Sequence, residues 1–217
     1  MIKGEYIDFV RNSLQMVDQT LKYHTEQVAA AIDVASASVF WEMYEKNPKV
    51  MKKALERYST LENNTVVNSV YSPRYTTVLM VDVVDLPKKA GGVLEIFADS
   101  SGDMASAQTV FVPVSTIEGQ QLYGSESSLP NNVVGFSLIR KNIIEYWGNA
   151  TLLASLTTGA GGTGVWVRYI KRFRDYSSTD RVEMPYGQDE RIVELVREYL
   201  SGIPPKDLVN DNADTNG

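Results

Sequence analysis

Residues 163–173, TGVWVRYIKRF, contain the clearest β-strand pattern in the chain, which extends from Val165 to Ile170. Its β-branched and aromatic residues are typical of strands. Similar short runs begin at about Tyr75, and turn-forming clusters separate them. These runs are YTTVLMVDVV, VLEIFA, TVFVPV, VVGFSLI and NIIEYW. Because they follow one another too closely for crossover helices, we expect a mainly antiparallel β-sheet over residues 75–174.

The residues before this region have a helical period instead. Apolar residues recur three and four positions apart in three successive stripes. The first is Ile2, Tyr6, Phe9, Val10, Leu14, Val17 and Leu21, the second Val28, Ile32, Ala35, Val39 and Met43, and the third Val50, Ala54, Leu55, Tyr58 and Leu61. Asn47-Pro48 separates the last two stripes, because proline disfavours helical geometry in the residue before it. Residues 1–62 therefore predict a small antiparallel helical bundle.

The end of the chain returns to a helical pattern. Residues 188–201 carry a broad apolar face, and acidic residues occupy the first turn, where the helix dipole favours them. Gly202 and Pro204-Pro205 end this helix. Residues 203–217, named here the C-terminal arm, contain few core-forming residues and predict a flexible segment. The order of helices, strands and helix predicts an α+β fold in one structural domain over residues 1–217.

The composition narrows the function classes. The chain has 217 residues, 43% of them hydrophobic and 22% charged, as in an ordinary globular protein. It has no cysteine, which removes disulfides and thiolate chemistry, and its one histidine, His24, leaves no imidazole pair for a metal. A net charge of -6 disfavours tight binding to a phosphate backbone. We expect no membrane association and synthesis in a cytoplasm, because no signal peptide or membrane-length apolar run is seen.

One glycine-rich stretch matches a nucleotide-binding pattern. Residues 159–164, GAGGTG, fit G-x-G-x-x-G. That pattern binds dinucleotides when a helix follows it and meets the pyrophosphate. A strand pattern follows here, so a loop that joins two strands explains the glycines better. We therefore predict no cofactor.

Candidate catalytic groups also have simpler explanations. His24 lies between two helical stripes and is read as a surface or helix-end residue, because nothing else marks a site around it. Asp82, Asp85 and Glu95 fall in or beside strands and could pair for acid–base chemistry or hold a cation. Acidic residues that alternate along a half-exposed strand are more often its solvated face. We predict no catalytic residues, no metal ligands and no enzyme activity.

A basic run with interleaved aromatic residues could serve recognition. Arg168, Lys171, Arg172 and Arg174 alternate with Tyr169, Phe173 and Tyr176. Such a run can bind single-stranded nucleic acid, or it can protect an edge strand by its charge. Because the rest of the chain is acidic, we favour a contact between subunits that involves Arg168 and Arg172.

Two further groups are candidate interface residues. Phe40, Trp41 and Tyr44 are large aromatic residues beside a run of small side chains from Ala29 to Ser38, which allows close approach of another helix. Leu208 and Val209 are apolar anchors in the otherwise polar end of the C-terminal arm. We expect these residues to contact a neighbouring copy.

The order of the segments resembles a known family. The pieces that carry the resemblance are MIKGEYIDFVRNSLQ at residues 1–15, FVPVSTIEGQQLYGSE at residues 111–126 and VEMPYGQDERIVELVREYL at residues 182–200. They are similar to the neck proteins of crAss-like phages, small virion proteins that stack as rings beneath the portal. The layout also resembles the tail adaptor of short-tailed phages.

The resemblance implies a virion structural protein without catalysis. It implies a dodecameric ring in the neck or tail that contacts the portal and adjacent ring or tail proteins. Genomic DNA would pass through its channel without specific binding, and the protein would be made in the bacterial host cytoplasm. The alternative from the residues is a small bacterial module that binds a ligand or another protein and has no catalytic activity.

Overall fold

The computed structural model describes residues 1–17, 23–46, 57–68, 75–86, 91–98, 109–115, 117–118, 132–157, 164–182, 184 and 187–202. The chain divides into two compact units, Met1–Val39 with Tyr176–Gly217, and Phe40–Asp175. Helices form the first unit and paired strands dominate the second. The predicted α+β class is confirmed. The single structural domain over residues 1–217 stays a prediction.

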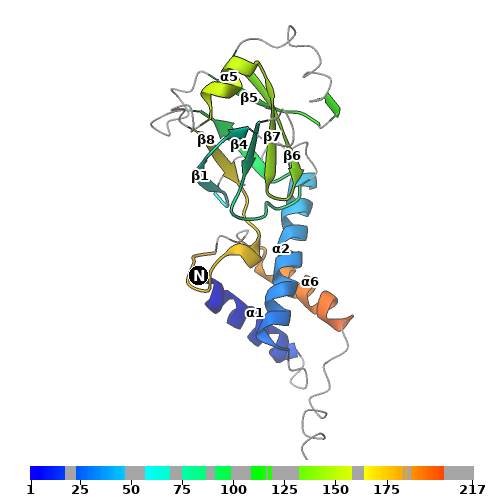
Figure 1. Cartoon of the computed structure of the whole chain (residues 1–217). Helices are drawn as coiled ribbons and strands as arrows, with labels where there is room; N and C mark the ends of the chain where they lie inside the picture. The colour runs from blue at the N-terminus through cyan, green and yellow to red at the C-terminus, as the bar shows by residue number, and fades with distance from the viewer. Residues whose placement is uncertain are drawn as a thin grey trace, which may run out of the picture. The chain divides into compact units, whose positions relative to one another are not determined.

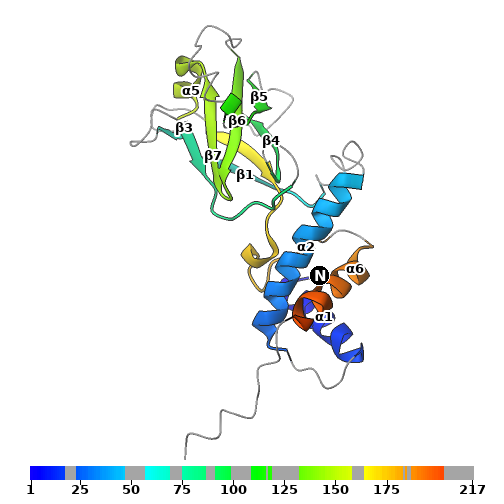
Figure 2. The ribbon, with the colours of Figure 1, turned by 90° about the vertical axis from the view of Figure 1, so that its right-hand side faces the viewer.

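The first unit contains the terminal helices. These are α1 (Lys3–Val17), α2 (Thr25–Lys46), of which the part up to Val39 belongs to this unit, and α6 (Asp189–Ser201). Their buried side chains are Tyr6, Ile7, Val10 and Leu14 of α1, Val28, Ala31, Ile32, Ala35 and Val39 of α2, and Ile192, Val196 and Leu200 of α6. The three helices of this unit lie together (Figure 1), and α1 contacts α6 (Figure 2). Both N-terminal helices and the predicted C-terminal helix are confirmed.

Hydrogen bonds join the two ends of the chain in this unit. The backbone N–H of Lys3 donates to the carbonyl of Asp180 at 2.9 Å, and that of Val182 donates to the carbonyl of Met1 at 3.1 Å. The Tyr6 hydroxyl donates to Asp189 Oδ1 at 3.1 Å, which links α1 to the first turn of α6. Residues far apart in the sequence thus form one unit.

The second unit is built from two sheets. A three-stranded sheet has the order β1-β8-β4, and a five-stranded sheet has the order β2-β3-β7-β6-β5. The strands are β1 (Thr60–Asn64), β2 (Val67–Asn68), β3 (Tyr75–Val78), β4 (Val93–Phe97), β5 (Val110–Pro113), β6 (Val133–Arg140), β7 (Ile143–Gly148) and β8 (Val165–Tyr169). Neighbouring strands are antiparallel except β5 and β6, which are parallel. The predicted mainly antiparallel sheet is confirmed.

Alternating side chains of both sheets share one hydrophobic core. Val165, Val167 and Tyr169 of β8 point into it from the smaller sheet. Phe136 of β6 and Tyr146 of β7 enter from the larger sheet, and both are almost fully buried. The alternating burial of β8 is the pattern expected of a strand with one buried face, whereas successive residues of β6 and β7 are buried on both faces. The short helix α5 (Ala150–Ser155) adds Leu153 to the same core.

Several predicted boundaries are wrong. The third predicted helix is contradicted at its end, since Tyr58 lies in a turn and Leu61 lies in β1; the rest of its stripe falls outside the described residues. Every residue of β1 pairs with β8, and this long-range pairing outweighs the local helical period. The predicted strand that begins at Tyr75 ends at Val78. β8 ends at Tyr169, and Phe173–Asp175 form the 3-10 turn η3.

Candidate interaction surfaces

The three aromatic interface candidates differ in accessibility. Phe40 is 3% exposed, and its ring centroid lies 5.9 Å from that of Tyr58. Tyr44 is half-buried, whereas Trp41 is 37% exposed. Of the small residues before them, Ala31 and Ala35 are buried inside the first unit. Trp41 is therefore the aromatic residue of this group that presents most surface to a partner.

Residues of the basic run make contacts inside the second unit. Arg168 lies on β8, which is the central strand of its sheet, so the alternative of a charged edge strand is wrong. Its Nε atom lies 3.1 Å from Oε2 of Glu95, its register partner on β4. The two side chains are 28% and 12% exposed. Arg172 is half-buried, and its backbone N–H donates to the carbonyl of Asp82 at 3.3 Å.

The histidine and the acidic residues that the sequence offered as candidate catalytic groups lie in the described part of the chain. His24 is exposed and directly precedes α2, and its backbone N–H donates to Gln27 Oε1 at 3.1 Å, which caps the helix. Asp82 pairs with Arg174, Glu95 pairs with Arg168, and Asp85 is exposed. In the described part of the chain, no group of three or more His, Asp or Glu side chains could hold a metal ion.

The glycine stretch is described only at its last member. Gly164 has a φ of +72°, and β8 follows it directly, as the sequence predicted. A Cβ atom at this position would lie 2.6 Å from the carbonyl oxygen of Asn64 on β1. This glycine is therefore required by backbone geometry at the start of β8. Residues 159–163 lie outside the described residues, as do Leu208 and Val209.

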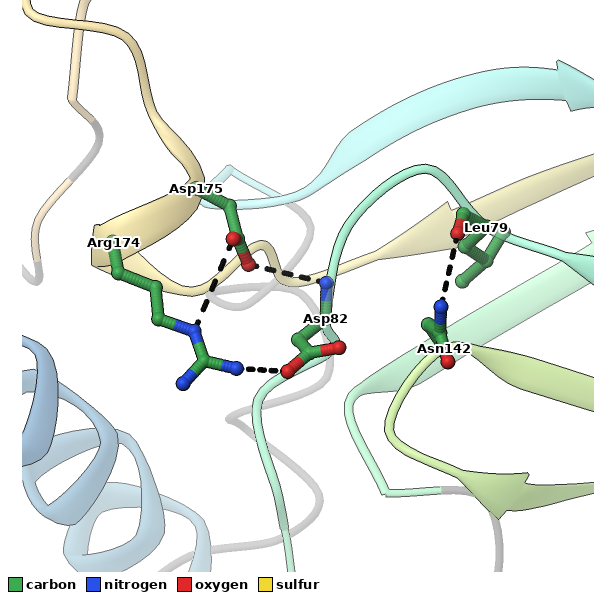
Figure 3. A network of polar contacts seen from close by, with 5 residues as sticks. All are labelled: Leu79, Asp82, Asn142, Arg174 and Asp175. Atoms are coloured by element: carbon green, nitrogen blue, oxygen red, sulfur yellow. Dashed lines mark hydrogen bonds and ion pairs between the residues drawn. The ribbon is translucent and has the colours of Figure 1, made fainter.

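Residues 79–84, which follow β3, form hydrogen bonds on two sides. On one side, the N–H of Leu79 donates to the carbonyl of Asn142 at 2.8 Å, and Asn142 Nδ2 donates back to the Leu79 carbonyl at 3.4 Å (Figure 3). The N–H of Val83 also donates to the carbonyl of Lys141 at 2.7 Å. These bonds fix the segment against the turn between β6 and β7.

On the other side, the segment meets the chain after β8. The N–H of Asp82 donates to Asp175 Oδ2 at 3.1 Å. The Arg174 guanidinium pairs with the Asp82 carboxylate and lies 3.9 Å from Asp175 Oδ1 (Figure 3). The N–H of Val84 donates to the carbonyl of Ile170 at 2.9 Å. Both sides together define the backbone of residues 79–84.

This segment presents apolar side chains to solvent. Met80 is 90% exposed although Leu79 and Val83 beside it are buried. Val78, at the end of β3, is 56% exposed, and Ile139, in the bulge of β6, is 40% exposed. Val78 pairs with Ile143, which in turn pairs with Arg140, so these positions lie at the same end of the sheet. Val78, Met80 and Ile139 are named here the hairpin-tip surface.

One buried carboxylate has no counterpart in the sequence predictions. Glu145 is 4% exposed at the middle of β7. Its register partners on the two neighbouring strands are Thr76 and Ser137, and its buried Oε2 atom accepts no hydrogen bond from the described residues. Its neighbours Ile144 and Tyr146 are buried as well, so this part of β7 is buried on both faces. Glu145 is therefore not a surface group that a partner could reach.

Comparison with known proteins places the chain in no family. No family model matches it, and no curated protein matches it. Among the described helices, none is long and apolar enough to span a membrane.

Proposed function

We propose that this chain is a virion structural protein that forms a ring in the neck or tail of a phage, connects the portal to the tail, and lines the DNA channel. The resemblance of its sequence to neck proteins of crAss-like phages supports the proposal. The hairpin-tip surface is the structural observation that carries it. A ring subunit needs a surface that docks on a different surface of the next copy, and repetition of this contact closes the ring.

The hairpin-tip surface suits such a contact. Met80 and Val78 leave water when a neighbour covers them, and each Å² of apolar surface buried contributes about 25 cal/mol. The backbone that carries Met80 is already fixed by hydrogen bonds to Asn142 and Lys141. Little backbone entropy is therefore lost on association, which favours binding by a preorganised surface.

The charge of the chain suits a channel wall. The formal net charge is -6, and like charge keeps a polyanion from adhering. Arg168 and Arg174 are each paired with a carboxylate of the same chain. Their charges are thus partly compensated, which supports passage of genomic DNA without specific binding.

A charge placed on the hairpin-tip surface tests this proposal. Met80→Glu should keep the fold, because the side chain is 90% exposed, and should weaken self-assembly about tenfold or more. Met16→Glu is the matched control, since Met16 is 85% exposed on α1. Sedimentation velocity over a range of protein concentrations measures the assembly of all three proteins. Equal assembly of the wild type and Met80→Glu contradicts the role of this surface.

The same measurement distinguishes a ring subunit from the alternative, a small binding module. If the wild type stays monomeric at high concentration, and also when mixed with the portal protein of the same virus, a small binding module explains the chain better than a ring subunit.

A further inference from the structure

A groove lies between α1 and α6 in the first unit. It has a volume of about 320 Å³. Its lining residues are Phe9, Ser13, Leu14, Glu190, Val193, Glu194 and Arg197. This volume is at the lower end of the range of about 300–1,000 Å³ found for ligand pockets. The groove is thus large enough to hold a few side chains of a peptide.

The groove has an apolar floor and a charged rim. Leu14 is 5% exposed and is the most buried of the lining residues, while Phe9 is 39% exposed and Val193 is half-buried. Glu190, Glu194 and Arg197 are exposed. A large aromatic side chain that remains two-fifths exposed beside other apolar groups is typical of a site that a partner covers.

The C-terminal arm carries the complementary groups in its sequence. Leu208 and Val209 are adjacent aliphatic residues that match the apolar floor. Lys206 and Asp207 directly precede them and carry one charge of each sign. Glu190 suits Lys206 and Arg197 suits Asp207, whereas Glu194 is paired with Arg191 at 3.4 Å.

We infer that this groove binds residues 206–209 of the C-terminal arm of a second copy of the chain. The inference rests on the proposed self-assembly and names a contact that serves it. Binding to the same copy would require the chain to reverse soon after α6 ends at Ser201. Pro204 and Pro205 fix their own φ angles and restrict the residues before them to extended geometry, which opposes such a reversal. A neighbouring copy is therefore the occupant that the sequence favours.

A peptide of residues 203–217 labelled with a fluorophore tests the inference by anisotropy. The receptor is the full-length chain with Leu208→Ser and Val209→Ser, so that its own arm does not compete. We expect saturable binding, weakened about tenfold by Phe9→Ala in the receptor. Tyr199→Ala is the matched control, since Tyr199 is a 46% exposed aromatic residue of α6 that does not line the groove. No saturable binding, or equal effects of Phe9→Ala and Tyr199→Ala, overturns the inference.

A second measurement decides whether the arm binds the groove of its own copy or that of a second copy. Sedimentation of the wild type and of the Leu208→Ser, Val209→Ser variant should show weaker association of the variant as concentration rises. If the two proteins associate equally although the peptide binds, the arm occupies the groove of its own copy and the inference is overturned.

The same results keep this inference separate from the proposed function. Rings that form although the peptide does not bind would reject the groove contact alone. Peptide binding that depends on Phe9, in a chain that forms no closed ring, would reject the ring alone.

Discussion

Gly164 illustrates how backbone geometry can require one particular residue in this chain. Its φ of +72° lies in a region that favours glycine, and an added Cβ would meet the carbonyl oxygen of Asn64 at 2.6 Å. The sequence showed a glycine motif that resembles a nucleotide site. The strand that follows it and the close approach of β1 explain its last glycine structurally.

Gly164→Ala should lower the free energy of unfolding by about 2–4 kcal/mol, because left-handed geometry and a clash with backbone both oppose the methyl group. Gly91→Ala in the same unit is the control. Gly91 also has a positive φ, of +52°, but its nearest neighbour is the flexible end of Leu138 at 3.2 Å. Gly91→Ala should lower the free energy of unfolding by about 1 kcal/mol. Urea unfolding followed by circular dichroism measures both, and equal losses would contradict the geometric explanation.

The buried side chain of Tyr146 makes the stability of the fold depend on pH. Its side chain is 1% exposed, its hydroxyl donates to Thr77 Oγ1 at 3.0 Å, and burial raises its pKa above the ordinary value of 10.0. Burial and the neighbouring Asp189 carboxylate likewise raise the pKa of Tyr6. Both residues keep their protons in the folded chain at a pH where the unfolded chain loses them.

Stability that depends on these protons is fully present below about pH 10 and falls as the pH rises further. One such proton contributes a slope of about 1.4 kcal/mol per pH unit. Tyr146→Phe should therefore lose stability less steeply above about pH 10 than the wild type, while costing about 1 kcal/mol near pH 7. Denaturant unfolding at several pH values between about 7 and 11 measures this. The prediction fails if both proteins show the same slope.

At the scale of elements, local patterns predicted the three long helices and most strands, but they also predicted a third N-terminal helix whose end is β1. α1, α2 and α6 follow apolar stripes, and β4 to β8 follow runs of β-branched and aromatic residues. β1 could not be predicted in this way, because its sequence Thr-Leu-Glu-Asn-Asn has one apolar residue and becomes a strand by pairing with β8. α5 was missed because six residues are too few to show a helical period.

The cap of α5 gives a prediction at this scale. Asn149 Oδ1 accepts hydrogen bonds from the N–H groups of Thr151 at 2.9 Å and Leu152 at 3.4 Å. Asn149→Ala should destabilise the second unit by about 1 kcal/mol, whereas Asn149→Asp, which keeps the acceptor, should cost much less. Hydrogen exchange of the α5 amides together with thermal unfolding measures the effect. Equal destabilisation by both substitutions would show that the side-chain oxygen is not what stabilises the helix.

At the scale of the whole molecule, the interaction surfaces were harder to predict than the fold. Phe40 and Arg168 have the residue types of an interface, yet Phe40 is buried and Arg168 pairs with Glu95. Met80 lies in an apolar run for which the sequence predicts a strand. Its exposure depends on hydrogen bonds that Leu79 and Val83 form with a turn about sixty residues away. Such long-range contacts leave no local signal in the sequence.

The central claim is that copies of this chain close into a ring. Electron microscopy of the purified protein, alone and mixed with a phage portal protein, tests this proposal most directly. We expect closed rings of uniform size in at least one of the two samples, with their number reduced by Met80→Glu and unchanged by Met16→Glu. Particles no larger than a single chain in both samples would contradict the claim.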